Sequence, residues 1–253
     1  MVSERGVLVV TGASRGIGAA VARLAGAAGY AVAVNYREGV DAARAVVAAI
    51  ETSGGRAVAV GADVGCEDAV ARMFEEVDDR LGGPLVGLVN NAAVIGGEAR
   101  VDEASAAALA RVWAVNVSGP FLCSREAIRR MSTRHGGGGG AIVNVSSLSA
   151  RNGGRAGRVH YAASKGALEV FSRGLALEVA GEGIRVNVVA PGPTATEIHD
   201  AWGGADRLAR IARTIPMRRP GEPEEPAHAV LWLLGDEASY VTGARIDVDG
   251  GAA

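Results

Sequence analysis

The sequence predicts an α/β fold, a doubly wound parallel sheet with helices on both faces, from two observations. Short apolar runs rich in Val and Ala alternate with helix-like segments along the 253 residues, and such runs are typical of strands buried on both faces of a parallel sheet. Aromatic residues are only 4% of the chain while glycines number 37, which suits thin helices packed closely on a sheet. We expect residues 1–253 to form a single domain.

Charge and cysteine content exclude several classes of function. A net charge of −2 provides no global basic field, so a nucleic-acid partner is not expected. Cys66 and Cys123 lack metal-ligand spacing, which argues against a metal site. No secretory segment precedes the first strand, and the apolar stretches are strand-sized or interrupted by charges, short of the roughly 20 residues that a membrane span requires. We therefore expect a reduced, cytoplasmic protein without a membrane segment.

The first strand and helix enclose a glycine-rich turn. Strand 7–10 is followed at once by Thr11–Gly18 and then by a helix over 19–29. Glycines let the backbone approach a pyrophosphate, and a helix N-terminus offers free N–H groups and a positive dipole end to bind it. The spacing is Gly-x-x-x-Gly-x-Gly rather than Gly-x-Gly-x-x-Gly, and a turn without a ligand is the alternative.

The second strand, 31–36, ends where a dinucleotide fold meets the adenosine ribose. An acidic residue at this point selects NAD, but the sequence here is Asn35-Tyr36-Arg37. Together with Arg15 in the glycine-rich turn, Arg37 supplies two guanidinium groups that suit a 2′-phosphate. The pattern favours NADP over NAD, the alternative being that both arginines are solvated surface charges.

Polar residues also follow the next two strands. After a helix over 40–52 and a strand over 57–60, Asp63 can hydrogen-bond an adenine amino group or cap the helix that begins near Glu67. The fourth strand, 85–89, ends in the amides Asn90 and Asn91, which we expect to brace neighbouring strands.

The rest of the chain completes the alternation. We expect a helix around 112–134, strands at 141–145 and 184–189, a helix from 220 through 234 and a last strand at 245–248. The Gly-rich segment around Trp202, about 193–217, predicts a substrate lid. Right-handed crossovers between parallel strands then give a seven-stranded sheet in the order 3-2-1-4-5-6-7.

Tyr161 and Lys165 stand four residues apart on a predicted helix. Residues at i and i+4 are neighbours on a helix surface. A phenol has a pKa of roughly 10, and a nearby cation lowers it. Tyr161 is therefore a candidate general acid and base, although this spacing alone can arise by chance.

Taken in order, these motifs resemble the short-chain dehydrogenase/reductase family over nearly the whole chain. Thr11–Gly18 resembles its Thr-Gly-x-x-x-Gly-x-Gly turn, Asn90-Asn91-Ala92 its strand-four motif, and Pro191-Gly192 its nicotinamide loop. The resemblance implies a compact Rossmann domain, hydride transfer between a carbonyl and a secondary alcohol, and a homotetramer.

Four residues match the family's catalytic tetrad in order and in element: Asn116, Ser147, Tyr161 and Lys165. The resemblance implies that Tyr161 donates a proton to the substrate oxygen and that Ser147 polarises the same carbonyl. Lys165 is expected to lower the phenol pKa and bind the nicotinamide ribose, and Asn116 to hold a water in a proton relay.

The contacts expected for NADP(H) are spread along the chain. They are Gly12, Ser14, Arg15, Gly16, Ile17, Gly18, Asn35, Tyr36, Arg37, Asp63, Val64, Asn91, Ala92, Tyr161, Lys165, Pro191, Gly192, Thr194 and Thr196.

Two departures from the family pattern stand out. Ala93 replaces a usual Gly, adding a methyl close to the expected nicotinamide position. Ser147 precedes Tyr161 by 14 residues (161 − 147), one more than usual, which leaves Ser146 as a rival to Ser147.

The substrate stays open between a sugar or polyol, a small ketone and a 3-oxoacyl thioester on a carrier. Arg134 and the basic segment 151–158 favour an anionic carrier, whereas Glu182, Asp200 and Asp206 oppose one. The alternative from another class is a non-catalytic NADPH sensor or assembly subunit, which would have no need of the tetrad.

Overall fold

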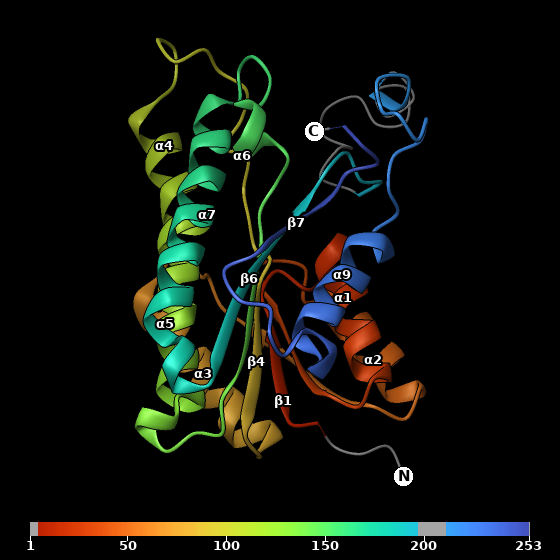
Figure 1. Ribbon diagram of the computed structural model, residues 1–253, viewed down its shortest axis with the longest axis vertical. Helices are drawn as coiled ribbons and strands as arrows, with labels where there is room; N and C mark the ends of the chain where they lie inside the picture. The colour runs from red at the N-terminus through yellow and green to blue at the C-terminus, as the bar shows by residue number, and fades with distance from the viewer. Residues whose placement is uncertain (1–4, 197–210, 253) are drawn as a thin grey trace.

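The computed structural model describes residues 5–196 and 211–252. Its strands form one parallel sheet in the order β3-β2-β1-β4-β5-β6-β7, with helices on both faces (Figure 1). The strands are β1 Val7–Val10, β2 Ala31–Tyr36, β3 Arg56–Gly61, β4 Leu85–Asn90, β5 Gly140–Val145, β6 Ile184–Pro191 and β7 Arg245–Val248. The fold class and strand order predicted from the sequence are confirmed.

The helices form two layers (Figure 1). One face of the sheet is covered by α1 Gly16–Ala27, α2 Val40–Thr52 and α9 Glu224–Leu234. The other is covered by α3 Glu67–Leu81, α4 Ala106–Trp113, α5 Gly119–Met131 and α7 Val159–Val179. Shorter elements are the π-helix η1 Ala114–Ser118, the helix α6 Ser149–Asn152 and the 3-10 turns η2 Thr133–His135, η3 Ala180–Glu182 and η5 Asp236–Ala238. The single helix expected around 112–134 is in fact α4 and α5, joined through η1.

Two cores result from the alternation of side chains along each strand. On β1, Leu8 and Val10 pack beneath α1, α2 and α9, whereas Val7 and Val9 pack beneath α3 and α5. All four side chains are buried, which explains why the strand is continuously apolar. Small residues bring the helices close together: a Cβ on Gly26 of α1 would lie 2.5 Å from Ile50 of α2.

Side-chain amides join the strands where they end. Asn90 Nδ2 donates to Asn144 Oδ1 of β5 at 2.8 Å, and Asn91 Nδ2 donates to the carbonyls of Thr11 at 3.0 Å and Gly12 at 2.9 Å. The bracing role expected of the two amides is confirmed. It fixes the carboxyl ends of β1, β4 and β5 relative to one another, at the point where the strand order reverses and ligands bind in such sheets.

One helical run departs from the sequence expectation. By length and composition, Ala106–Met131 is apolar enough to cross a membrane, with 33% of its most apolar window buried. In the fold this run is α4, η1 and α5, which pack in the helical layer between α3 and α7 (Figure 1).

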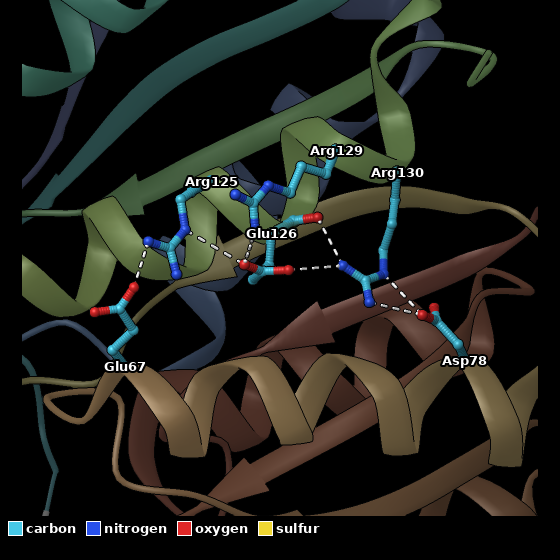
Figure 2. A network of polar contacts seen from close by, with 6 residues as sticks. All are labelled: Glu67, Asp78, Arg125, Glu126, Arg129 and Arg130. Atoms are coloured by element: carbon cyan, nitrogen blue, oxygen red, sulfur yellow. Dashed lines mark hydrogen bonds and ion pairs between the residues drawn. The ribbon is translucent and has the colours of Figure 1, made fainter. Parts of the chain in front are cut away.

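A charged network joins α3 to α5; it consists of Glu67, Asp78, Arg125, Glu126, Arg129 and Arg130 (Figure 2). At its centre the Glu126 side chain is only 7% exposed and binds Arg129 at 2.8 Å and Arg130 at 3.1 Å. Arg130 also binds Asp78 at 2.8 Å. Each charge in the network thus faces an opposite charge, which compensates for burying Glu126.

Candidate active site

A cleft of about 710 Å³ opens at the carboxyl ends of the central strands. All of the expected cofactor residues except Gly18 line it, and so do Ser147, Tyr161 and Lys165. Asn116 does not. The residues predicted from the sequence therefore line one cleft, except for Gly18 and Asn116, whose positions are described below.

The glycine-rich turn needs its glycines for different reasons. Gly12 and Gly16 have φ of +59° and +54°, in the region that favours glycine. A Cβ on Gly12 would also lie 2.8 Å from the Ala92 backbone. On Gly18 it would lie 2.4 Å from Asn91 Nδ2. Gly18 therefore lets α1 pack against the end of β4, whereas Gly12 and Gly16 shape the wall of the cleft.

The N-terminus of α1 is arranged to receive an anion. No side chain caps the helix, and its first turn contains no acidic residue. Arg15, at the N-cap position, is extended and exposed beside the cleft. Uncapped N–H groups, the helix dipole and a guanidinium together fit the pyrophosphate of a dinucleotide.

The residues at the end of β2 have unequal roles. Asn35 is buried; its Oδ1 accepts from the Gly12 N–H at 3.2 Å, and its Nδ2 donates to the carbonyls of Val60 and Ala62 at 3.2 Å. It ties the glycine-rich turn to β3 rather than offering its amide to a ligand. Arg37 is exposed and pairs with Glu38, which also lines the cleft.

Asp63 lines the cleft but does not cap α3, so one of its two predicted roles is wrong. Its carboxylate pairs with Arg111 of α4 at 2.8 Å and accepts from the Gly65 N–H at 2.9 Å, and no side chain caps α3. Burial acts to raise the pKa of Asp63, but the hydrogen bonds from Arg111 and Gly65 outweigh it and hold the pKa below its ordinary value. Arg111, which also lines the cleft, was not anticipated from the sequence.

The end of the cleft that contains the predicted catalytic residues is formed by α7 and the loop after β5. Lys165 is buried, donates from Nζ to the Val145 carbonyl at 2.7 Å, and lies 5.9 Å from the centre of the Tyr161 ring. Ser147 hydrogen-bonds to the Tyr161 phenol. Ser146 instead donates to Glu169 at 2.7 Å. The geometry thus brings Ser147, and not its rival Ser146, to the phenol.

Burial shifts the pKa of Tyr161 and of Lys165, which both lie on α7. It raises the pKa of Tyr161, while the hydrogen bond from Ser147 and the charge of Arg158 act in the opposite direction. Burial therefore outweighs the lowering of the Tyr161 pKa that is expected from a neighbouring cation. The cation that acts to lower this pKa is Arg158 rather than Lys165. Burial also lowers the pKa of Lys165 to about 8, against the opposing charge of Glu169.

Asn116 lies in the π-helix η1, outside the cleft lining. It is buried, exchanges two hydrogen bonds of 2.8 Å with the main chain of Val94, and donates to Ser164 Oγ at 3.0 Å. Ser164 in turn donates to the Tyr161 carbonyl at 2.7 Å. Asn116 therefore ties the loop after β4 to α7. Single π turns inside α-helices often occur at functional sites.

Comparison with known proteins agrees with this geometry. The family model described as enoyl-(acyl carrier protein) reductase matches residues 12–253. The chain belongs to the short-chain dehydrogenase/reductase family. It is 48% identical to the uncharacterized oxidoreductase YgfF of Escherichia coli over 97% of this chain and 99% of that protein. It is 38% identical to glucose 1-dehydrogenase 2 of Bacillus subtilis over 96% and 93%.

A solved structure of the family resembles the chain closely. A short-chain dehydrogenase from Burkholderia cenocepacia in complex with NADP superposes with a TM-score of 0.89 at 35% identity, over 98% of this chain and 97% of that one. The protein is therefore an NAD(P)-dependent oxidoreductase, and the family resemblance inferred from its motifs is confirmed.

One cationic residue of this short-chain dehydrogenase/reductase was missed from the sequence. Arg158, at the N-cap of α7, is 9% exposed and lines the cleft. Its Nε donates to Glu98 at 2.9 Å, and Arg155 binds the same carboxylate. The sequence singles out 151–158 as a basic, Gly-rich segment that favours an anionic carrier, but it does not single out Arg158 within that segment.

Other charges weighed at the sequence level lie away from the site. Glu182 accepts from Ser132 and pairs with Arg134 at 3.9 Å, and neither charge lines the cleft. The two therefore bear on helix packing rather than on substrate choice. Asp200 and Asp206, like most of the predicted lid at 193–217, lie outside the described residues.

Proposed function

We propose that the protein is an NADP(H)-dependent oxidoreductase that interconverts a carbonyl and a secondary alcohol by hydride transfer. The observation that carries this proposal is the grouping of Ser147, Tyr161 and Lys165 at one end of the cleft, with Arg15 and Arg37 at the other. A protein that only bound the cofactor would have no use for the first group.

The chain's own residues handle the substrate oxygen and its proton. The nicotinamide cofactor supplies the hydride chemistry when bound. During reduction, the Tyr161 hydroxyl donates its proton to the substrate oxygen, and Ser147 donates a hydrogen bond to the same oxygen. Because burial raises the Tyr161 pKa, the phenol holds its proton until the substrate oxygen accumulates negative charge.

Lys165 is suited to return the proton to Tyr161. With a pKa of about 8, its ammonium group exchanges protons near neutral pH, which an exposed lysine with a pKa of about 10.4 does poorly. When the cofactor is bound, Lys165 would also hold the nicotinamide ribose. Asn116 supports a relay to Lys165 by holding the loop after β4 against α7.

NADP is preferred over NAD in this proposal because Arg15 and Arg37 lie where the 2′-phosphate would bind. Both side chains are exposed and line the cleft. The pairing of Arg37 with Glu38 competes with this contact. Arg37 must leave the Glu38 carboxylate to bind the 2′-phosphate. Glu38 thus limits the preference for NADP over NAD.

The proposed assembly is a cytoplasmic homotetramer built from a single domain with a small lid. Large apolar side chains are exposed on neighbouring helices, with Phe121 of α5 at 51%, and Val170 and Leu177 of α7 at 75%. Exposed apolar groups on adjacent elements are typical of interfaces between subunits. Sedimentation at micromolar concentration should give four subunits, and a monomer would contradict the proposal.

The substrate class in this proposal includes sugars or polyols, small ketones and 3-oxoacyl compounds. A carbonyl and alcohol panel, run in parallel with NADPH and NADH, tests the whole assignment. We expect turnover with at least one class and a higher kcat/KM with NADPH. Tight NADPH binding with no turnover across the panel would instead favour a sensor.

A further inference from the structure

Arg111 is a cleft-lining cation that none of the sequence motifs includes. It lies on α4, and its Nη1 pairs with Asp63 Oδ2 at 2.8 Å. Because Asp63 follows β3, the ion pair joins this helix to the carboxyl end of the sheet. Both side chains line the cleft and are about one third exposed, at 35% for Arg111 and 31% for Asp63. The guanidinium is therefore accessible from the cleft while the carboxylate holds one of its nitrogens.

The loop after β3 fixes the orientation of this guanidinium. Asp63 Oδ1 accepts from the Gly65 N–H at 2.9 Å, so the carboxylate that binds Arg111 is itself held by the main chain. A Cβ on Gly65 would lie 3.2 Å from Arg111 Nη1, and the missing side chain lets the guanidinium pack closely over the loop. A planar group that is already held in one orientation loses little conformational freedom when a ligand binds to it.

The surroundings of Arg111 in the cleft suit a flat aromatic group. Val64 is the neighbour of Asp63, and Val115 follows Arg111 by about one helical turn. Both valines are buried and line the cleft. Apolar side chains beside a planar cation fit the faces of an aromatic ring, on which a guanidinium can stack.

The sheet places this part of the cleft beyond the cofactor ribose. In a dinucleotide-binding fold the pyrophosphate lies at the N-terminus of the first helix, and the adenosine ribose lies at the end of the second strand. β3 is the neighbour of β2, and Ala62 N–H continues their pairing by donating to the Tyr36 carbonyl at 2.8 Å. A base attached to that ribose therefore reaches the end of β3, where Asp63 binds Arg111.

We propose that Arg111 contacts the face of the cofactor's adenine ring and that Asp63 holds it in position for this contact. The inference rests on the proposed NADP(H)-dependent function and adds a residue that binds the base. Its role differs from that of Arg15 and Arg37, which are proposed to bind the 2′-phosphate. Because NADH and NADPH carry the same adenine, Arg111 should strengthen the binding of both.

The test measures dissociation constants from cofactor fluorescence with the full-length protein. NADPH, NADH and the hypoxanthine analogue of NADPH are titrated separately. Arg111→Ala should weaken the binding of all three by about 3–30-fold, because each has a purine face on which a guanidinium can stack. Arg72→Ala is the matched control, since Arg72 is an exposed arginine of α3 outside the cleft; its constants should match the wild type.

A second variant separates stacking from charge. Arg111→Lys keeps a cation that can pair with Asp63 but has no planar guanidinium face. Binding of the three cofactors should therefore stay about threefold or more weaker than in the wild type. Wild-type constants in this variant would mean that charge alone is required, which would overturn the inference.

The choice of cofactors makes three further outcomes decisive against the inference. Unchanged constants in Arg111→Ala would show that Arg111 does not contact the base. A loss for NADPH and its analogue but not for NADH would assign Arg111 to the 2′-phosphate. A loss that spares the hypoxanthine analogue would mean that Arg111 acts only by orienting Asp63 toward the amino group of adenine. Each of these leaves the oxidoreductase function intact, whereas a wild-type protein that binds neither NADPH nor NADH would remove that function and this inference with it.

Discussion

Two groups of buried charges lie in the same helical layer and differ in where they lie relative to the cleft. On α5, Glu126 pairs with arginines, of which Arg125 and Arg130 also bind acids of α3 (Figure 2). On α7, Lys165 donates to a main-chain carbonyl, and Arg158 shares one carboxylate with Arg155. The first group lies between two helices, whereas Arg158 and Lys165 of the second group line the cleft. Position thus distinguishes charges that support packing from charges at a candidate ligand site.

The largest effect should come from removing Tyr161, the proposed proton donor, which lines the cleft. Tyr161→Phe should lower kcat by about 10²–10⁴-fold, the usual contribution of a general acid, while NADPH binding measured by fluorescence stays intact. Tyr240→Phe is the control, since Tyr240 is fully exposed. Wild-type turnover in the Tyr161 variant would end the proposed mechanism.

The second prediction concerns the cofactor end of the cleft, which Arg15 and Arg37 line. Arg15→Ala with Arg37→Ala should reduce the ratio of NADPH to NADH kcat/KM by about 10–100-fold, because each exposed guanidinium–phosphate contact contributes about 1 kcal/mol. Arg23→Ala changes an exposed arginine of α1 outside the cleft and should leave the ratio unchanged. An unaltered ratio in the double variant would mean that both arginines are solvated surface charges.

The balanced network should matter for stability and not for catalysis. Glu126→Ala removes the carboxylate that Arg129 and Arg130 share. We expect a loss of about 2 kcal/mol in the free energy of unfolding, below the value for a fully buried pair because the arginines are partly exposed. Urea unfolding measures it, with the exposed Glu75→Ala of α3 as control. A large fall in kcat for the folded variant would contradict the distinction drawn between the two groups.

Features that depend on neighbouring residues in the sequence can be predicted, whereas contacts between residues far apart along the chain cannot. Continuous apolar runs and the glycine-rich turn determine the strands and their order, because burial on both faces dictates composition locally. The π-helix at Asn116 was not predicted, since it depends on bonds to Val94 and Ser164. The positions of Glu98 and Arg111 were missed for the same reason: each pairs with a residue far away along the chain.

The smallest expected effect concerns the titration of Lys165, the only lysine of the chain. Glu169, which accepts from Ser146 at 2.7 Å and Arg245 at 3.1 Å, raises the Lys165 pKa against the effect of burial. Glu169→Gln keeps the shape and removes the charge, so the pKa should fall below about 8, by roughly one unit or less.

Lysine labelled with ¹³C at the ε-carbon makes this shift directly measurable, because one side-chain signal titrates without overlap. A lower pKa leaves less protonated Lys165 at pH 7–8, so the alkaline limb of the kcat profile should move to lower pH by the same amount. Glu178→Gln, on an exposed position of α7, should change neither signal nor profile. An unshifted Lys165 resonance in the Glu169 variant would show that desolvation alone sets its pKa. A shifted resonance with an unmoved kcat profile would remove Lys165 from the proton relay.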